Sequence, residues 1–195
     1  MNSSVRNAFG RAGVAAILFI SHLAAADAVR VACVGDSITY GSGLHRTYPA
    51  QLGRWLGTNY EVRNFGVSAT TLLHRGDFPY IGRPAYTNAL AFQPEIVVID
   101  FGANDSKHPG DGSLEAANAV NNWRFKGDFI GDYKEMIAAF RKSNPAMKIF
   151  ICYPTPDFPG RWGINDKTIR DEMIPMIRAV ANETGTRVID LRSAL

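Results

Sequence analysis

Five short apolar runs rich in β-branched residues divide this sequence, and segments with helical periodicity lie between them. The runs are Val29–Val34, Glu61–Asn64, Glu95–Phe101, Met147–Tyr153 and Arg187–Leu191. Several are apolar throughout, which is typical of strands that are covered on both faces. Strands that alternate with helices predict a parallel sheet between two layers of helices, so we expect a three-layer α/β/α fold.

The helical patterns cover residues 52–56, 129–140 and 166–184. The second pattern stops at Asn144-Pro145, and in the third we expect a kink at Pro175 and a cap at Gly185. We find no internal repeat and no second domain, so residues 29–195 are interpreted as one domain. The alternation predicts a flavodoxin-like, five-stranded parallel sheet in the order 2-1-3-4-5.

Residues 1–28 have the layout of a cleaved secretory signal. Two arginines precede an apolar run, and small residues follow it, with cleavage expected near Ala26 or Ala28. The run is shorter than the roughly 20 residues that cross a bilayer. Without this segment the chain is nearly neutral and has no basic stripe, which argues against a nucleic-acid partner. We therefore expect a secreted or periplasmic protein with no membrane partner after cleavage.

Cys33 and Cys152 are the two cysteines of the chain, and each lies within a predicted strand. In the order 2-1-3-4-5, the third strand separates them by two strand spacings, on the order of 9–10 Å, which exceeds the reach of a disulfide. We therefore predict two free thiols, and a disulfide between them would contradict the strand order.

Three polar loops follow the first three predicted strands. They contain Gly35-Asp36-Ser37, Asn64–Ser68 and Gly102-Ala103-Asn104-Asp105. The carboxyl ends of parallel strands meet at one edge of a sheet, where α/β proteins commonly bind ligands. We therefore expect a hydroxyl, a glycine amide and a carboxamide to gather along this edge.

This combination suits acyl transfer from an ester. Ser37 can act as the nucleophile, while the Gly66 N–H, the Asn104 side chain and the Ser37 amide can donate to the oxygen that becomes negative. Each residue alone also has an ordinary interpretation, because serine after Gly-Asp is commonly a turn or N-cap and Asn-Asp commonly bonds its own loop. The conjunction at three strand ends favours the catalytic interpretation.

The motifs Gly35–Gly41, Gly66 within Asn-Phe-Gly-Val-Ser, and Gly102–Asp105 resemble the first three blocks of the SGNH hydrolases, the GDSL-type esterases. The resemblance extends over nearly all of residues 29–195 and is nearest to secreted carbohydrate O-acetylesterases. It implies that Ser37 is the nucleophile, that Gly66 and Asn104 complete the oxyanion hole, and that Asp36 holds the loop, with Gly35, Gly102 and Asp105 in support. It implies acetyl esters of carbohydrate as substrates and neither cofactor nor metal.

Members of this family carry their general base, a histidine, in an Asp-x-x-His block after the fifth strand, and residues 1–195 contain no counterpart. We therefore expect a C-terminally incomplete member that lacks the last helix, exposes an apolar patch on one sheet face, and hydrolyses esters weakly or not at all. The histidines outside the signal are His45, His74 and His108, and each is interpreted as a solvated loop residue.

Two other functions stay open. Ser37, Thr39 and Ser42 suit a flavodoxin-like phosphate or flavin site, although no Walker lysine is present. A carbohydrate-binding pseudoenzyme would instead use aromatic stacking surfaces, for which the candidates are Tyr153, Phe158, Trp123 and Trp162. We expect segment 107–126 to wall one side of the substrate cleft and the loop 78–86 the other.

Overall fold

The computed structural model describes residues 27–41, 47–108, 120–156 and 161–193. Residues 1–26 of the predicted signal, with His22, and also Ser42, His45 and Phe158, lie outside the described residues.

A five-stranded parallel sheet forms the centre of the molecule, and its strand order is β2-β1-β3-β4-β5, as predicted. The strands are β1 (Val29–Gly35), β2 (Tyr60–Asn64), β3 (Ile96–Asp100), β4 (Lys148–Tyr153) and β5 (Arg187–Asp190). Their bounds agree with the apolar runs to within a residue. The register pairs Gly35 with Asp100 and Tyr153 with Asp190, so these strand ends share one edge of the sheet.

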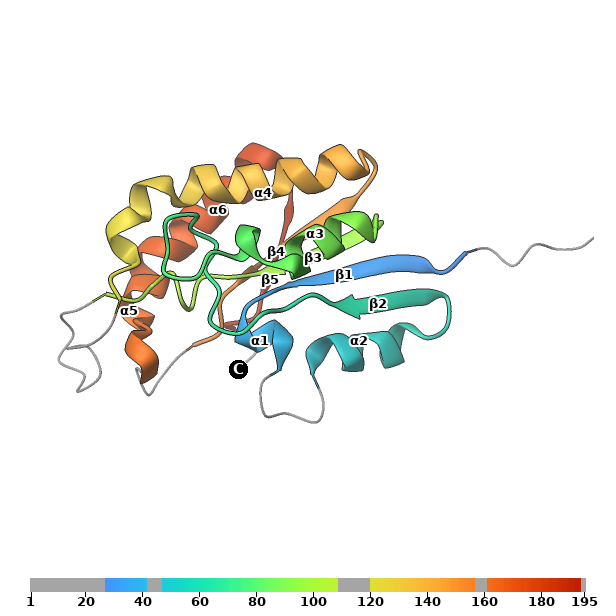
Figure 1. The fold of residues 1–195 in the computed structure, drawn as a ribbon, viewed down its shortest axis with the longest axis horizontal. Helices are drawn as coiled ribbons and strands as arrows, with labels where there is room; N and C mark the ends of the chain where they lie inside the picture. Colours follow the sequence, from blue (N-terminus) through green and yellow to red (C-terminus); the bar gives the residue numbers. More distant parts are fainter. Residues whose placement is uncertain (1–26, 42–46, 109–119, 157–160, 194–195) are drawn as a thin grey trace, which may run out of the picture.

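Helices lie on both sides of the sheet, which confirms the three-layer fold. They are α1 (Ser37–Tyr40), α2 (Tyr48–Leu56), α3 (Pro84–Ala91), α4 (Phe129–Ser143), α5 (Asp166–Thr168) and α6 (Ile174–Thr184), with short 3₁₀ turns at Tyr80–Gly82, Trp123–Asp128 and Arg161–Gly163. Figure 1 shows α3, α4 and α6 together on one side of the sheet and α1 and α2 on the other.

The predicted helix 166–184 contains an irregular segment, as expected from its proline. Residues Ile169–Met173 form a π-helical turn between α5 and α6, and Pro175 lies in the first turn of α6. Proline lacks the N–H that would continue the preceding helical ladder, and the wider turn accommodates this loss. The prediction of a loop over residues 78–86 is partly wrong, because α3 already begins at Pro84. Proline suits the first turn of a helix.

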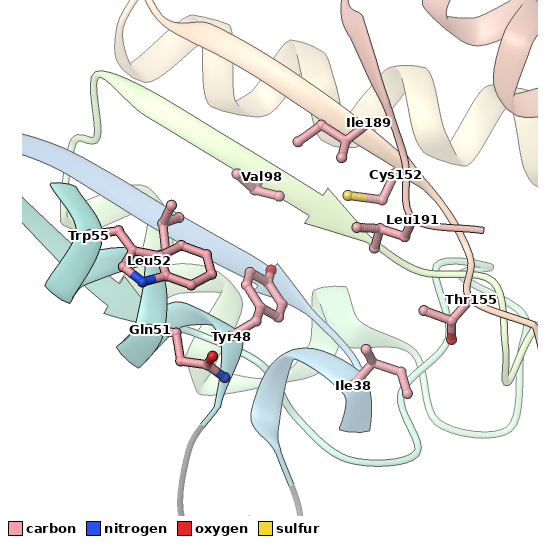
Figure 2. Close-up of a pocket in the computed structure, with 10 residues that line it drawn as sticks. All are labelled: Ile38, Tyr48, Gln51, Leu52, Trp55, Val98, Cys152, Thr155, Ile189 and Leu191. Carbon is pink, nitrogen blue, oxygen red and sulfur yellow. The ribbon is translucent and has the colours of Figure 1, made fainter. Parts of the chain in front are cut away.

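The two sheet faces are covered unequally. Beneath α3, α4 and α6, strand residues such as Val34, Ile99 and Ile151 are fully buried. On the other face, a groove of about 480 Å³ lies between α2 and the strands, where the sequence predicted an apolar patch. Figure 2 shows the residues that line it: Ile38, Tyr48, Gln51, Leu52, Trp55, Val98, Cys152, Thr155, Ile189 and Leu191.

Cys33 and Cys152 are buried free thiols, as predicted, since β3 separates their strands. Within the ranges that the structure describes, no helix has both the length and the apolar character needed to cross a membrane.

Candidate active site

Ser37 is the first residue of α1, directly after β1. The Asp36 side chain caps this helix by accepting a hydrogen bond from the Ile38 N–H at 2.9 Å. The turn is tight, because a Cβ at Gly35 would lie 2.5 Å from the Asp100 carbonyl oxygen. Ser37 itself is half-buried, and its own N–H has no acceptor within the helix because it belongs to the first turn. The local sequence therefore presents a hydroxyl and an amide at the carboxyl edge of the sheet.

Gly66 lies in the loop after β2, as predicted, but its N–H is already engaged. It donates to Asn64 Oδ1 at 2.8 Å, while Asn64 Nδ2 donates to the Thr39 carbonyl oxygen at 2.9 Å. A Cβ at Gly66 would lie 2.3 Å from the Tyr40 backbone nitrogen. Gly66 thus allows the loop to pack against α1. The oxyanion role expected for Gly66 stays a prediction, and in this structure its N–H donates within its own loop, to Asn64 Oδ1.

Ala69, three residues later, lies beside Ser37 at the same cavity. It lies in the left-handed region with φ 67°, is exposed, and lines the same cavity as Ser37. Left-handed backbone in a residue with a Cβ costs on the order of 1 kcal/mol and is found preferentially at functional sites. The sequence did not reveal this position, because alanine gives no signal for a positive φ.

Asn104 reaches the cavity from the loop after β3 and is buried. Its Nδ2 donates to the Thr70 carbonyl oxygen at 3.1 Å and lies 3.4 Å from Asp36 Oδ2. The second contact is long for a hydrogen bond, so one N–H of the carboxamide is weakly held. The Asn122 side chain donates to the Asn104 carbonyl oxygen at 2.8 Å and fixes the loop from the other side.

Asp105 ties this loop to the preceding one. Its two carboxylate oxygens accept hydrogen bonds from the Leu72 N–H at 3.1 Å and the Leu73 N–H at 2.7 Å. Burial raises the pKa of Asp105 to about 7, and the two backbone hydrogen bonds oppose that shift. Asp105 therefore holds the two loops together.

A second buried carboxylate, Asp100, lies beneath the Ser37 turn. Burial raises the pKa of Asp36 to about 7, with a further contribution from the negative charge of Asp100. Burial likewise raises the pKa of Asp100 to about 7, and its Oδ2 has no hydrogen-bond partner. Two neighbouring buried carboxyl groups favour a protonated form, because both charges cannot be solvated there. Sequence reasoning treated Asp100 as part of an apolar strand and missed it.

These loops enclose a cavity of about 290 Å³ at the carboxyl edge. It is lined by Ser37, Ser68, Ala69, Asn104, Lys107, Trp162 and Ile164. The structure thus brings together Ser37 and Asn104, two of the three predicted catalytic residues, and Ala69 lines the cavity with them, whereas Gly66 does not line it. Gly102, with φ 135°, supports the turn that leads to Asn104. The larger groove of Figure 2 is lined by Ile38 but not by Ser37.

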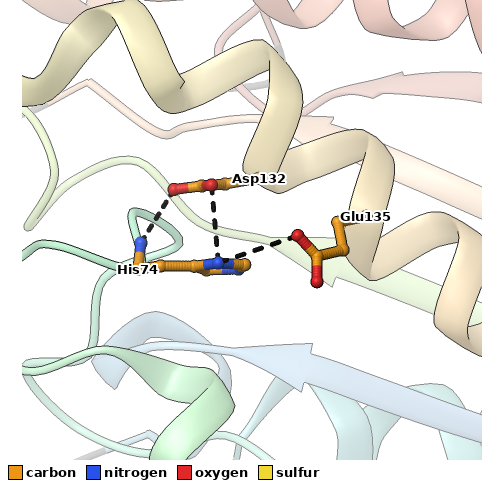
Figure 3. A group of neighbouring side chains, drawn as sticks. All are labelled: His74, Asp132 and Glu135. Atoms are coloured by element: carbon orange, nitrogen blue, oxygen red, sulfur yellow. Dashed lines mark hydrogen bonds and ion pairs between the residues drawn. The ribbon is translucent and has the colours of Figure 1, made fainter.

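The histidines of the described residues contact other parts of the molecule. His108 Nε2 lies 2.8 Å from Thr168 Oγ1, at α5. His74 lies against α4, where its Nδ1 is 3.4 Å from Asp132 Oδ1 and 3.9 Å from Glu135 Oε2 (Figure 3). Neither histidine is among the residues that line the cavity with Ser37.

The group of His74, Asp132 and Glu135 has the side-chain types that bind zinc, and the three potential ligand atoms lie within 4.8 Å of one another. The same group also acts as a clamp, because Asp132 Oδ2 accepts a 2.8 Å hydrogen bond from the His74 backbone N–H. Glu135 is largely exposed. The ion pairs account for the arrangement without a metal.

The aromatic residues proposed for stacking differ in their positions. Trp123 is 5% exposed, packs against Phe129, and donates from Nε1 to Glu172, so it belongs to the core. Trp162 is 70% exposed and lines the cavity. Thr39, proposed for a phosphate site, is buried with its Oγ1 3.4 Å from the Tyr48 hydroxyl, so it does not present its hydroxyl to a ligand.

The sheet order and the cavity at its carboxyl edge define a three-layer α/β/α protein with a ligand site at the strand ends. Residues 33–195 match the model of the GDSL-like lipase/acylhydrolase family, and the chain belongs to this family.

Similar proteins include several carbohydrate esterases. An acetylxylan esterase of Xylanibacter ruminicola is 42% identical over 190 residues, an alignment that covers 87% of this chain and 37% of that protein. The chain thus spans little more than a third of the length of this relative.

Among solved structures, a catalytic variant of an acetylxylan esterase from Geobacillus stearothermophilus has a TM-score of 0.55 at 16% identity, covering 86% of this chain and 78% of that one. A family two carbohydrate esterase from Clostridium thermocellum, solved with cellohexaose, has a TM-score of 0.57 at 21% identity, covering 87% and 56%. At these identities the structural matches show the fold.

Proposed function

We propose that this protein is a serine ester hydrolase that removes acetyl groups from carbohydrate, with Ser37 as its nucleophile. The observation that carries the proposal is the cavity in which the Ser37 hydroxyl, the Asn104 carboxamide and the left-handed Ala69 backbone meet. The relationship to an acetylxylan esterase supports acetyl groups on a polysaccharide as the substrate class. The predicted signal at residues 1–28 suits this role, because polysaccharides lie outside the cell.

The reaction proceeds through an acetyl-enzyme. Ser37 Oγ attacks the ester carbonyl carbon, its proton passes to a base, and the carbonyl oxygen becomes negative. The N–H groups of Ala69 and Ser37 and the weakly held N–H of Asn104 donate to this oxygen. The tetrahedral intermediate then expels the sugar oxygen, which takes a proton. Water attacks the acetyl group next, releasing acetate and restoring the Ser37 hydroxyl.

A base that could accept the Ser37 proton is not identified among the described residues of the cavity. No histidine is among the described residues that line the cavity. Without a histidine base, such sites retain only the contribution of the oxyanion donors and of substrate binding. We therefore propose that hydrolysis by residues 1–195 is slow, and that external imidazole accelerates it by accepting the proton in place of a histidine.

Acetate release from acetylated xylo-oligosaccharides tests this function, with and without imidazole. We expect a slow release that imidazole increases and that Ser37→Ala abolishes. Ser143→Ala, at the end of α4, is the matched control and keeps the rate. In the presence of imidazole, a fluorophosphonate probe, which loses fluoride as it bonds to a nucleophilic serine, should label Ser37 in the mass spectrum of the digested protein. Equal acetate release by the parent and by Ser37→Ala would refute the proposal.

A further inference from the structure

Trp162 combines two features that rarely occur together in a surface residue. Its side chain is 70% exposed, and its backbone is left-handed, with φ 55° and ψ 23°. Among the described residues, the non-glycine residues with positive φ are Ala69, Gln93 and Trp162. Two of these three line the cavity that contains Ser37. Strained backbone persists where surrounding contacts enforce it, and it concentrates at ligand sites.

The segment after Trp162 is anchored to the loop that carries Asn104. Asn165 is buried, and its N–H donates to Ser106 Oγ at 3.0 Å. Ser106 Oγ in turn donates to the Ala103 carbonyl oxygen at 2.7 Å. The Asn165 side chain also caps α5 by accepting from the Thr168 N–H at 2.8 Å. Trp162 therefore lies three residues before Asn165, which is hydrogen-bonded to the loop that carries Asn104. This buried contact holds the segment of Trp162 close to the nucleophile.

An exposed indole is not by itself evidence of a site, since single apolar side chains are common on protein surfaces. Trp55 shows this, because it is 81% exposed and lines the groove between α2 and the sheet rather than the Ser37 cavity. What distinguishes Trp162 is its place in the wall of the cavity, its strained backbone and its anchor. A pyranose ring has an apolar face of C–H groups and a polar rim, which matches a flat aromatic surface with polar neighbours. Ser68 and Lys107 line the same cavity and supply that polar rim with hydrogen-bonding groups.

We propose that Trp162 is a stacking platform for the sugar ring that carries the acetyl group, and that it gives the site its preference for carbohydrate esters over short aliphatic esters. This inference rests on the proposed role of Ser37 as the nucleophile. The sugar lies against the indole, and its acetyl group extends to Ser37 between Ala69 and Asn104.

A binding experiment tests the platform independently of catalysis. The Ser37→Ala variant is titrated with acetylated xylo-oligosaccharides by calorimetry, and Trp162→Ala and Trp162→Phe are then added to that background. We expect Trp162→Ala to weaken binding about fivefold to tenfold, since aromatic contacts of this kind account for roughly that factor, and Trp162→Phe to weaken it about twofold. Trp55→Ala is the matched control and leaves the affinity unchanged. Thermal unfolding of each variant verifies that it is folded.

A kinetic experiment then separates this inference from the proposed function. Acetate release from ethyl acetate and from the oligosaccharides is compared in chains with an intact Ser37, in the presence of imidazole. Trp162→Ala should lower kcat/KM about fivefold to tenfold for the oligosaccharides and leave that for ethyl acetate unchanged.

If hydrolysis of both esters depends on Ser37 but does not change in Trp162→Ala, the stacking role of Trp162 is overturned and the proposed esterase function stands. Absence of carbohydrate binding by the parent would also overturn it. Binding that depends on Trp162 without any Ser37-dependent hydrolysis would instead support the platform and refute the proposed function.

Discussion

The loops at the carboxyl edge of the sheet differ in how they are held. The loops after β1, β2 and β3 are linked by buried hydrogen bonds, of which those of Asn104 and Asp105 are the centre. The loop after β5 is held by partly exposed contacts, such as the Arg192 to Asp166 ion pair at 2.7 Å, whereas the segment after β4 also has the buried Asn165 to Ser106 hydrogen bond. Buried hydrogen bonds are costly to break because the separated groups cannot reach water. The first three loops therefore form a rigid frame for the reacting groups, the segment after β4 is tied to that frame, and the loop after β5 is the less firmly held one.

The largest expected effect is the loss of the buried clamp. Asp105→Ala leaves the Leu72 and Leu73 N–H groups without acceptors in the interior, and we expect a loss of about 2–5 kcal/mol in the free energy of unfolding. Asp190→Ala is the matched change at the end of β5, because Asp190 accepts hydrogen bonds from Arg192 and Ser193 but is exposed. Water can replace it there, so its loss should stay below about 1 kcal/mol. Urea unfolding measures both.

Equal losses for Asp105→Ala and Asp190→Ala would remove the distinction between the two groups of loops. Asp105→Asn keeps one acceptor oxygen and should fall between the parent and Asp105→Ala, which separates lost hydrogen bonds from general disruption of the core.

Replacement of Gly66 should be the next largest effect. In Gly66→Ala the new methyl group would overlap the Tyr40 backbone nitrogen, so α1 must shift, and we expect a loss of about 1–3 kcal/mol. Activity should fall too, because α1 begins with Ser37. Gly131→Ala in α4 is the control. Nothing lies within 4 Å of its added Cβ, and alanine should stabilise that helix by about 0.5–1 kcal/mol. If Gly66→Ala unfolds at the same urea concentration as the parent, the close packing is not required.

The strands, their order and the free cysteines were predictable because they follow from periodicity and from rules of strand connection. Ser37 and Asn104 were predictable because polar residues after apolar strands meet at one edge. The backbone N–H that joins Ser37 and Asn104 in the proposed oxyanion site was not predictable from the sequence. Two features beside the cavity depend on the folded loop: the Asn64 side chain accepts the hydrogen bond of the Gly66 N–H, and Ala69 is left-handed. No residue type in Val67-Ser68-Ala69 signals a positive φ.

The pH dependence of stability should reveal the buried carboxylates beneath Ser37. Asp36 and Asp100 have pKa values raised to about 7 in the folded protein, chiefly by burial, whereas an unfolded aspartate titrates near 3.9. Between about pH 4 and pH 7 the folded state therefore binds more protons than the unfolded state. Stability should fall as the pH rises through this window and level off above it.

Asp100→Asn isolates this effect, because it removes one titrating group and nearly preserves the shape. Between pH 5 and pH 8 the free energy of unfolding, measured with urea, should fall by less than in the parent. We expect the difference to be on the order of 1–2 kcal/mol. Asp190→Asn provides the comparison at the end of β5, where hydrogen bonds from Ser193 lower the pKa of Asp190, so its replacement should leave the decline above pH 5 unchanged. A parent protein that gains stability from pH 5 to pH 8 would contradict the proposed protonation of the pair.

The smallest effect concerns Ala69, where the rigid frame includes a strained residue. Glycine adopts a left-handed conformation without the steric cost of a Cβ, but it also gives the unfolded chain more freedom. Ala69→Gly should therefore change stability by less than about 1 kcal/mol, with relief of strain and loss of rigidity opposing each other. Its N–H remains, so Ser37-dependent acetate release should stay within about twofold of the parent. Ala69→Val is the contrasting change, because a β-branched residue is poorly accommodated at positive φ. If Ala69→Val slows acetate release while its free energy of unfolding stays near that of the parent, the backbone conformation at this residue serves the reaction. Equal rates of acetate release in the parent, Ala69→Gly and Ala69→Val would remove the Ala69 N–H from the proposed oxyanion site.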